Sequence, residues 1–194
     1  VVALCFVVRR HYRRVGAALS DLYSQLGDLP AEPDRAARIA SALAHGLDPA
    51  APTAAVLVAS YGGLGIHTTY GILRSFPAHF RNIVFLSVGV IDSGAFKGED
   101  ALEALRAETE RMLGRYVDLA HGLGVSASCR FAIGTDAVEE AEKLCLQVAR
   151  EFPHTTVFAG KVVFERERWY QRLLHNETAF AIQKRLQFEG QPMV

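Results

Sequence analysis

Apolar runs alternate with amphipathic stretches along most of the chain after Pro52. Four runs are short and nearly continuous, namely AAVLVAS, NIVFLSVGV, SASCRFAI and TTVFAG. Each is followed by a stretch whose apolar residues recur every three or four positions, as on one face of a helix. In the longest stretch this stripe comprises Leu102, Leu105, Met112, Tyr116, Ala120 and Leu123. Apolar strands that alternate with helices are typical of a parallel sheet covered on both faces. The pattern therefore predicts a doubly wound α/β domain over residues 51–194, with a further strand starting at GQPMV.

The first 50 residues have a different pattern. Residues 1–8 are an uninterrupted apolar octet, much shorter than the ~20 residues that a membrane-spanning helix needs. A basic cluster follows it directly, comprising Arg9, Arg10, Arg13 and Arg14. In a signal peptide the charges precede the apolar run, whereas basic residues after the run are typical of the cytoplasmic end of a membrane span. The octet is therefore either the end of a span or a buried strand before a basic turn, and a helical connector extends to residue 50.

Composition limits the classes of function. The chain of 194 residues is 50% hydrophobic and 22% charged, as globular proteins are, and its 21 basic and 21 acidic residues balance. No overall field attracts nucleic acid, so we expect no nucleic-acid partner. The three cysteines lie far apart, which indicates neither a disulfide framework nor a zinc knuckle. No GxSxG, HExxH or Walker sequence occurs, and we expect neither a metal site nor catalysis.

The glycine-rich segment after the first predicted strand is the best candidate for a binding site. Ligands of open α/β sheets bind at the carboxyl ends of the strands, where glycines let backbone N–H groups approach a phosphate at a helix N-terminus. We expect a loop here, with the candidate ligand residues Ser60, Gly62, Gly63, Gly65, His67, Thr68 and Thr69. The segment begins a GxGxxG pattern but has Thr68 at the third glycine, so a plain turn is the alternative, with His67 packing or capping a helix.

Three further candidate residues lie at the ends of the other predicted strands, namely Asp92, Gly134 and Gly160. Because a doubly wound sheet brings the carboxyl ends of its strands to one edge, we expect these residues beside the glycine-rich loop. Asp92 offers an acceptor for a ribose hydroxyl. The sequence TDAVEE, with Asp136 followed three residues later by Glu139, predicts a capping box rather than a site.

From Pro52 onward, the order of strands, loops and helices resembles the universal stress protein family. The resemblance rests on VGVID, on HGLGVSASCRFAIGTDAVEEAEKLC and on TTVFAG, and it implies a Rossmann-like sheet and a homodimer. ATP-binding members of that family have GxxG after the fourth strand, then nine residues and Gly-Ser or Gly-Thr. Here Gly160 matches the first glycine, whereas Val163, Leu173 and Leu174 replace the other motif residues. The resemblance therefore does not imply that ATP binds in the manner of that family.

The whole chain, including RRHYRRV and YGGLGIHTTYGILRSFP, resembles the cytoplasmic C-terminal region of bacterial permeases of the amino acid–polyamine–organocation superfamily. This resemblance implies that the octet ends the last membrane span and that the four arginines lie at the anionic surface of the bacterial inner membrane, on its cytoplasmic side. It implies a regulatory and dimerisation domain of an amino acid or cation permease, whose partner is the transmembrane part of the same polypeptide.

The same resemblance suggests a ligand for such a domain without establishing one. Relatives in the potassium-importing branch are regulated by a cyclic dinucleotide, so an adenine nucleotide or a cyclic dinucleotide shared across a dimer axis is the expected ligand. Two alternatives remain. One is a free-standing nucleotide-binding stress protein. The other is a Rossmann-type oxidoreductase, which the incomplete GxGxxG pattern and the lack of a catalytic constellation disfavour.

Overall fold

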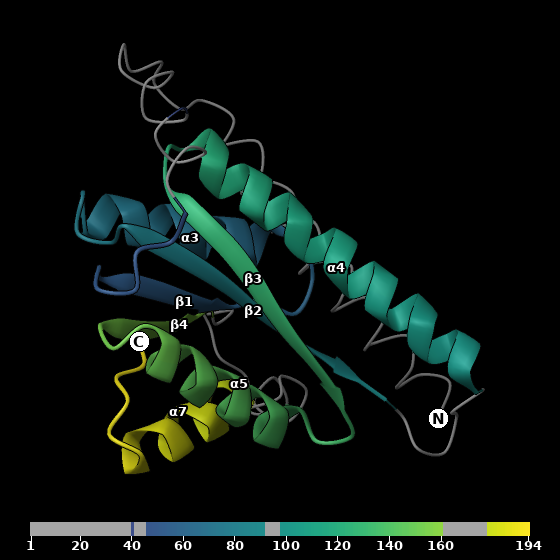
Figure 1. The fold of residues 1–194 in the computed structure, drawn as a ribbon. Coiled ribbons are helices and arrows are strands. Elements are labelled where there is room, and N and C mark those ends of the chain that lie inside the picture. The colour runs from purple at the N-terminus through teal and green to yellow at the C-terminus, as the bar shows by residue number, and fades with distance from the viewer. Residues whose placement is uncertain (1–39, 41–45, 92–97, 161–177) are drawn as a thin grey trace, which may run out of the picture.

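The computed structural model describes residues 40, 46–91, 98–160 and 178–194, which form a parallel sheet with helices on both faces (Figure 1). Along the chain the elements are β1 (Thr53–Leu57), α3 (Gly63–Ser75), β2 (Asn82–Val90), α4 (Glu99–Gly122), β3 (Ser126–Gly134), α5 (Ala137–Glu151), β4 (Thr155–Ala159) and α7 (Thr178–Phe188). The four strands that the apolar runs predict are all present. Among the described helices, none has the length and apolar character that crossing a membrane requires.

Several predictions fall outside the described residues. These are the apolar octet, most of the connector, and the residues Arg9, Arg10, Arg13, Arg14, Asp92, Val163, Leu173 and Leu174.

The strand order of the sheet is β3-β2-β1-β4, and every pair is parallel. The chain moves from β1 through β2 to β3 in one direction, and α5 then returns it to the other side of β1. The direction of winding therefore reverses between β1 and β4, which is the topological switch point of a doubly wound sheet. Met193 pairs in parallel with Val157 of β4 as an isolated bridge, so the GQPMV segment lies beside β4, where a further strand was expected. The predicted fold class is confirmed.

β1, β2 and β4 are mostly buried on both faces, which explains why their runs are continuously apolar rather than alternating, whereas every residue of the edge strand β3 is half-buried. Ile83 and Phe85 of β2 join one core cluster with residues of α3 and α4. Val84 and Leu86, the intervening residues, join a second cluster with residues of α5 and α7. The two helix pairs therefore cover opposite faces of the sheet, as Figure 1 shows.

The buried face of α4 differs in part from the predicted stripe. Its buried residues are Thr109, Leu113, Tyr116 and Ala120, which follow the helical spacing of four, three and four. Tyr116 and Ala120 agree with the prediction. Leu113 is fully buried although the prediction had chosen Met112, because the side of the helix that faces the sheet lies one residue further round.

The strands start at the same level but do not end at the same level. At the amino edge Thr53 of β1 is in register with Asn82 and Thr155, and Asn82 with Ser126. At the other edge β1 ends opposite Leu86, whereas β2 continues to Val90 and stays paired with β3. These four extra residues correspond to about 13 Å at ~3.3 Å per residue. The carboxyl ends therefore share one edge, as a parallel sheet requires, but they are not level and form a step.

Candidate functional site

The β1–α3 loop lies at the switch point, beside the end of β4. The segment predicted as a loop through Thr69 is mostly helical, because α3 begins at Gly63. Ile66, Thr69 and Ile72 are buried at a spacing of three, so the burial of this face favours helix despite the glycines. The true loop is short and ends at Gly62, whose backbone is extended with φ −164° and ψ 171°.

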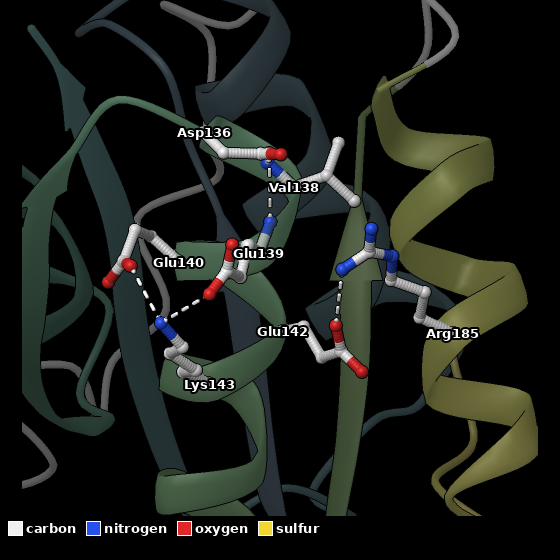
Figure 2. Close-up of polar contacts among 7 residues, drawn as sticks. All are labelled: Asp136, Val138, Glu139, Glu140, Glu142, Lys143 and Arg185. Atoms are coloured by element: carbon white, nitrogen blue, oxygen red, sulfur yellow. Dashed lines mark hydrogen bonds and ion pairs between the residues drawn. The ribbon is translucent and has the colours of Figure 1, made fainter.

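The N-terminus of α3 has no side-chain cap within the described part of the chain. Its N-cap is Gly62, and no acidic residue lies in its first turn. The contrast with α5 is direct, because there the Asp136 carboxylate accepts hydrogen bonds from the N–H groups of Val138 and Glu139 (Figure 2). An uncapped N-terminus presents unsatisfied N–H groups and the positive end of the helix dipole, which together suit an anion.

The loop is held from the side by Tyr116 of α4. The Tyr116 hydroxyl donates to the Ser60 carbonyl oxygen at 2.9 Å and accepts from the Gly62 N–H at 3.2 Å. Its ring is fully buried and stacks on Phe85 with 5.0 Å between the centroids. Of the loop's donors, the Gly62 N–H is therefore already engaged, and the loop has a fixed conformation.

Three of the predicted site glycines have packing neighbours that explain them. A Cβ at Gly65 would overlap the hydroxyl of Tyr116. A Cβ at Gly160 would lie 2.6 Å from Thr68 Oγ1 and 2.8 Å from Leu64 Cγ, so the end of β4 touches the start of α3. A Cβ at Gly134 would lie 2.5 Å from Glu140 Cγ. Gly160 therefore lies beside the start of α3. Gly134, at the end of the longer strand β3, lies against α5 instead.

The polar side chains of the predicted site divide into two groups. Ser60 and His67 are exposed. Thr68 is half-buried and donates to the Leu64 carbonyl oxygen at 2.8 Å, and the fully buried Thr69 donates to that of Gly65 at 2.9 Å. Both threonine hydroxyls hydrogen-bond within α3, so the expectation that they face a ligand has no support in this conformation.

Sequence reasoning missed two residues beside the loop, Tyr61 and Arg115. The Arg115 guanidinium lies 3.7 Å from the centroid of the Tyr61 ring, a cation–π contact. Tyr61 in turn packs against Tyr116 with 4.8 Å between the ring centroids. Arg115 therefore places a positive charge next to the loop. In the sequence it lies on what looks like the solvated face of a long helix, and only the tertiary contact distinguishes it.

The described residues offer neither a metal centre nor an activated thiol. No group of three or more metal-ligating side chains occurs among them. Burial raises the pKa of the Cys145 thiol to about 12, and burial likewise raises the pKa of Cys129. Both cysteines are therefore protonated at neutral pH, whereas a nucleophilic cysteine needs the thiolate.

The fold and the switch point define a doubly wound α/β protein with a candidate anion site at the N-terminus of α3. No protein-family model matches the sequence, and no curated protein matches it. A crystal structure of a protein from the universal stress protein family of Burkholderia pseudomallei is similar, with a TM-score of 0.49 and 17% sequence identity. The match covers 73% of this chain and 92% of that chain.

Proposed function

We propose that this chain is a regulatory and dimerisation domain that binds a phosphorylated small molecule at the N-terminus of α3. The observation that carries the proposal is the uncapped glycine N-terminus at the topological switch point, where ligands of doubly wound sheets bind. The Arg115 side chain supplies positive charge beside it. The Ser60 side chain, exposed in the loop, supplies a hydroxyl for a phosphate oxygen.

The proposed ligand is an adenine nucleotide or a cyclic dinucleotide. A phosphate group matches the helix N-terminus in charge and in hydrogen-bonding capacity. A cyclic dinucleotide carries two phosphates related by approximate twofold symmetry, which fits a homodimer whose two sites lie across its axis. Asp92, the proposed ribose acceptor, lies outside the described residues.

We propose further that the domain belongs to a bacterial permease for amino acids or cations and lies on the cytoplasmic side of the inner membrane. The support is the apolar octet, the basic cluster after it, and the resemblance of the whole chain to permease C-terminal regions. Transport sites lie near the bilayer midplane among membrane spans, so this domain controls transport rather than forming the path. A free-standing nucleotide-binding protein fits the fold equally well.

Isothermal titration calorimetry with ATP, AMP, NAD and cyclic di-AMP tests the ligand proposal. Gly62→Asp places a carboxylate at the N-cap, and Gly62→Asn places an uncharged group of the same shape there. Both residues are good N-caps and the extended backbone accepts them, so both variants should fold. Charge repulsion in Gly62→Asp should raise the Kd about tenfold or more relative to Gly62→Asn.

Two results would contradict the proposal. One is the absence of heat with all four ligands on folded wild-type protein. The other is equal affinity of the Asp and Asn variants. The stoichiometry distinguishes the ligand modes, because a shared cyclic dinucleotide gives one ligand per two chains and a mononucleotide gives one ligand per chain.

A further inference from the structure

A short segment before β1 is fastened to the amino edge of the sheet. In this entry segment, residues 46–52, the half-buried Leu47 packs against the core cluster beneath α5 and α7. The Asp48 N–H donates to Oδ1 of Asn82 at 3.2 Å, and Nδ2 of Asn82 donates to the Asp48 carbonyl oxygen at 2.7 Å. The amide side chain of Asn82 thus pairs with the main chain of Asp48 as a neighbouring strand would.

The same side chain also joins the entry segment to β1. Nδ2 of Asn82 donates to Thr53 Oγ1 at 2.9 Å, and the Thr53 hydroxyl donates to the Ala51 carbonyl oxygen at 3.0 Å. The Asp48 side chain folds the segment on itself, because its carboxylate accepts from the Ala50 N–H at 2.9 Å. Asn82 therefore lies at the centre of one hydrogen-bond network that contains the entry segment, β1 and β2.

The position of Asn82 argues for a specific role. It is 1% exposed and begins a strand whose next five residues are all buried. A buried amide is costly unless its groups are paired, and asparagine is depleted in strands. An apolar residue would suit this position if filling the core were its only purpose. The polar residue is explained by the entry segment that it binds.

We propose that Asn82 is a positioning residue that fixes the entry segment to β1 and β2, so that residues 46–52 move with the sheet instead of acting as a free linker. This role does not depend on the proposed ligand, whose site lies at the opposite edge. The chain then enters the sheet at Gly46 through a segment that is hydrogen-bonded to two neighbouring strands.

Hydrogen exchange of the full chain tests this role. Asn82→Ala removes the side chain, and Asn82→Leu replaces it with an apolar side chain of the same branching in case the first variant does not fold. In either variant the amide hydrogens of Asp48 and Ala51 should exchange about tenfold faster relative to those of Val56 and Phe85 in the core. Thermolysin should also cleave the Gly46–Leu47 bond faster, because Leu47 leaves the core.

Two controls separate this effect from general destabilisation. Asp48→Ala keeps the main-chain groups that Asn82 binds and removes only the contact with the Ala50 N–H, so exchange of the amide at position 48 should change much less than in the Asn82 variants. Ile72→Val weakens the core on the other face of the sheet, so it should not change the ratio of entry-segment exchange to core exchange. The proposal is overturned if Asn82→Ala or Asn82→Leu leaves that ratio at the wild-type value, or if Ile72→Val raises it equally.

Discussion

Gly65 and Gly71 lie in the same helix, α3, but their surroundings differ. A Cβ at Gly65 would collide with the hydroxyl of Tyr116, whereas a Cβ at Gly71 would find no atom within 4 Å. Gly65 therefore lets α4 approach α3 closely. Gly71 only carries the entropic cost of glycine in a helix.

Alanine substitutions at these two glycines should have opposite effects on the free energy of unfolding. Gly71→Ala should stabilise the protein by about 1 kcal/mol, because alanine has the higher helix propensity. Gly65→Ala should destabilise it by about 1–3 kcal/mol, because the gain in propensity is smaller than the cost of overpacking against Tyr116. Urea unfolding followed by circular dichroism measures both values. A stabilising Gly65→Ala would show that the close approach of Tyr116 is not needed.

At this scale the sequence identifies residue types but not their partners. A glycine that cradles a phosphate and a glycine that admits a tyrosine ring look the same in GGLGIHTT. The distinction for Gly65 depends on Tyr116, which follows 51 positions later in the chain. For the same reason Arg115 was missed, since its neighbour Tyr61 comes from a different element.

Single elements could be predicted better than single contacts. The N-cap of α5 is confirmed, because Asp136 accepts from the N–H groups of Val138 and Glu139 at 2.8 and 3.1 Å. The second half of the predicted capping box is replaced by an ion pair, in which the Glu139 carboxylate lies 2.7 Å from Lys143 Nζ (Figure 2). The predicted start of α3 was too late by several residues. The glycines locally disfavour a helix, but burial of one helix face stabilises it from Gly63 onward.

The N-cap of α5 should make stability depend on pH in acid. The N–H of Glu139, and then that of Val138, lower the pKa of Asp136 below its ordinary value. A lowered pKa contributes stability that is fully present above the pKa of the unfolded chain and is lost as the pH falls through that of the folded chain. Wild type should therefore lose stability relative to Asp136→Asn between about pH 4 and pH 2.

Thermal unfolding of both proteins at pH 7, 5, 4, 3 and 2 measures this difference. The difference should be constant between pH 7 and 5, because Asp136 is ionised throughout that range in both the folded and the unfolded chain. A difference that stays constant down to pH 2 would contradict the assigned role of the carboxylate.

For the whole molecule, the alternation of strands and helices predicted the doubly wound topology correctly, since few arrangements bury strands on both faces. The step at the carboxyl edge was not predicted, although the run lengths contain a signal for it. NIVFLSVGV has nine residues and TTVFAG has six, in line with β2 being longer than β4. Strand ends were assumed to be level, and Gly134 was therefore assigned to the same site as Gly160.

The proposed contact between the arginine cluster and an anionic membrane gives a prediction for residues 9–14. Each arginine near an anionic surface contributes about 1 kcal/mol at low salt. Replacing Arg9, Arg10, Arg13 and Arg14 together with glutamine should therefore greatly weaken binding to vesicles that contain phosphatidylserine, measured by co-sedimentation. The same four positions changed to lysine keep the charge and should keep binding. Equal binding of wild type and the glutamine variant would remove the support for a membrane-surface contact.

The step between the strand ends also sets a minimum length for any ligand that contacts both of them. The ends of β1 at Leu57 and of β3 at Gly134 are offset by about 13 Å along the strand direction, so a molecule that touches both must span at least that offset. A single phosphate or a small organic acid is too short to do so, and an extended nucleotide has the required length. Shortening β2 and β3 by two residues each, one repeat of the strand, would therefore change which ligand lengths reach both ends while leaving the chemistry of the loop untouched.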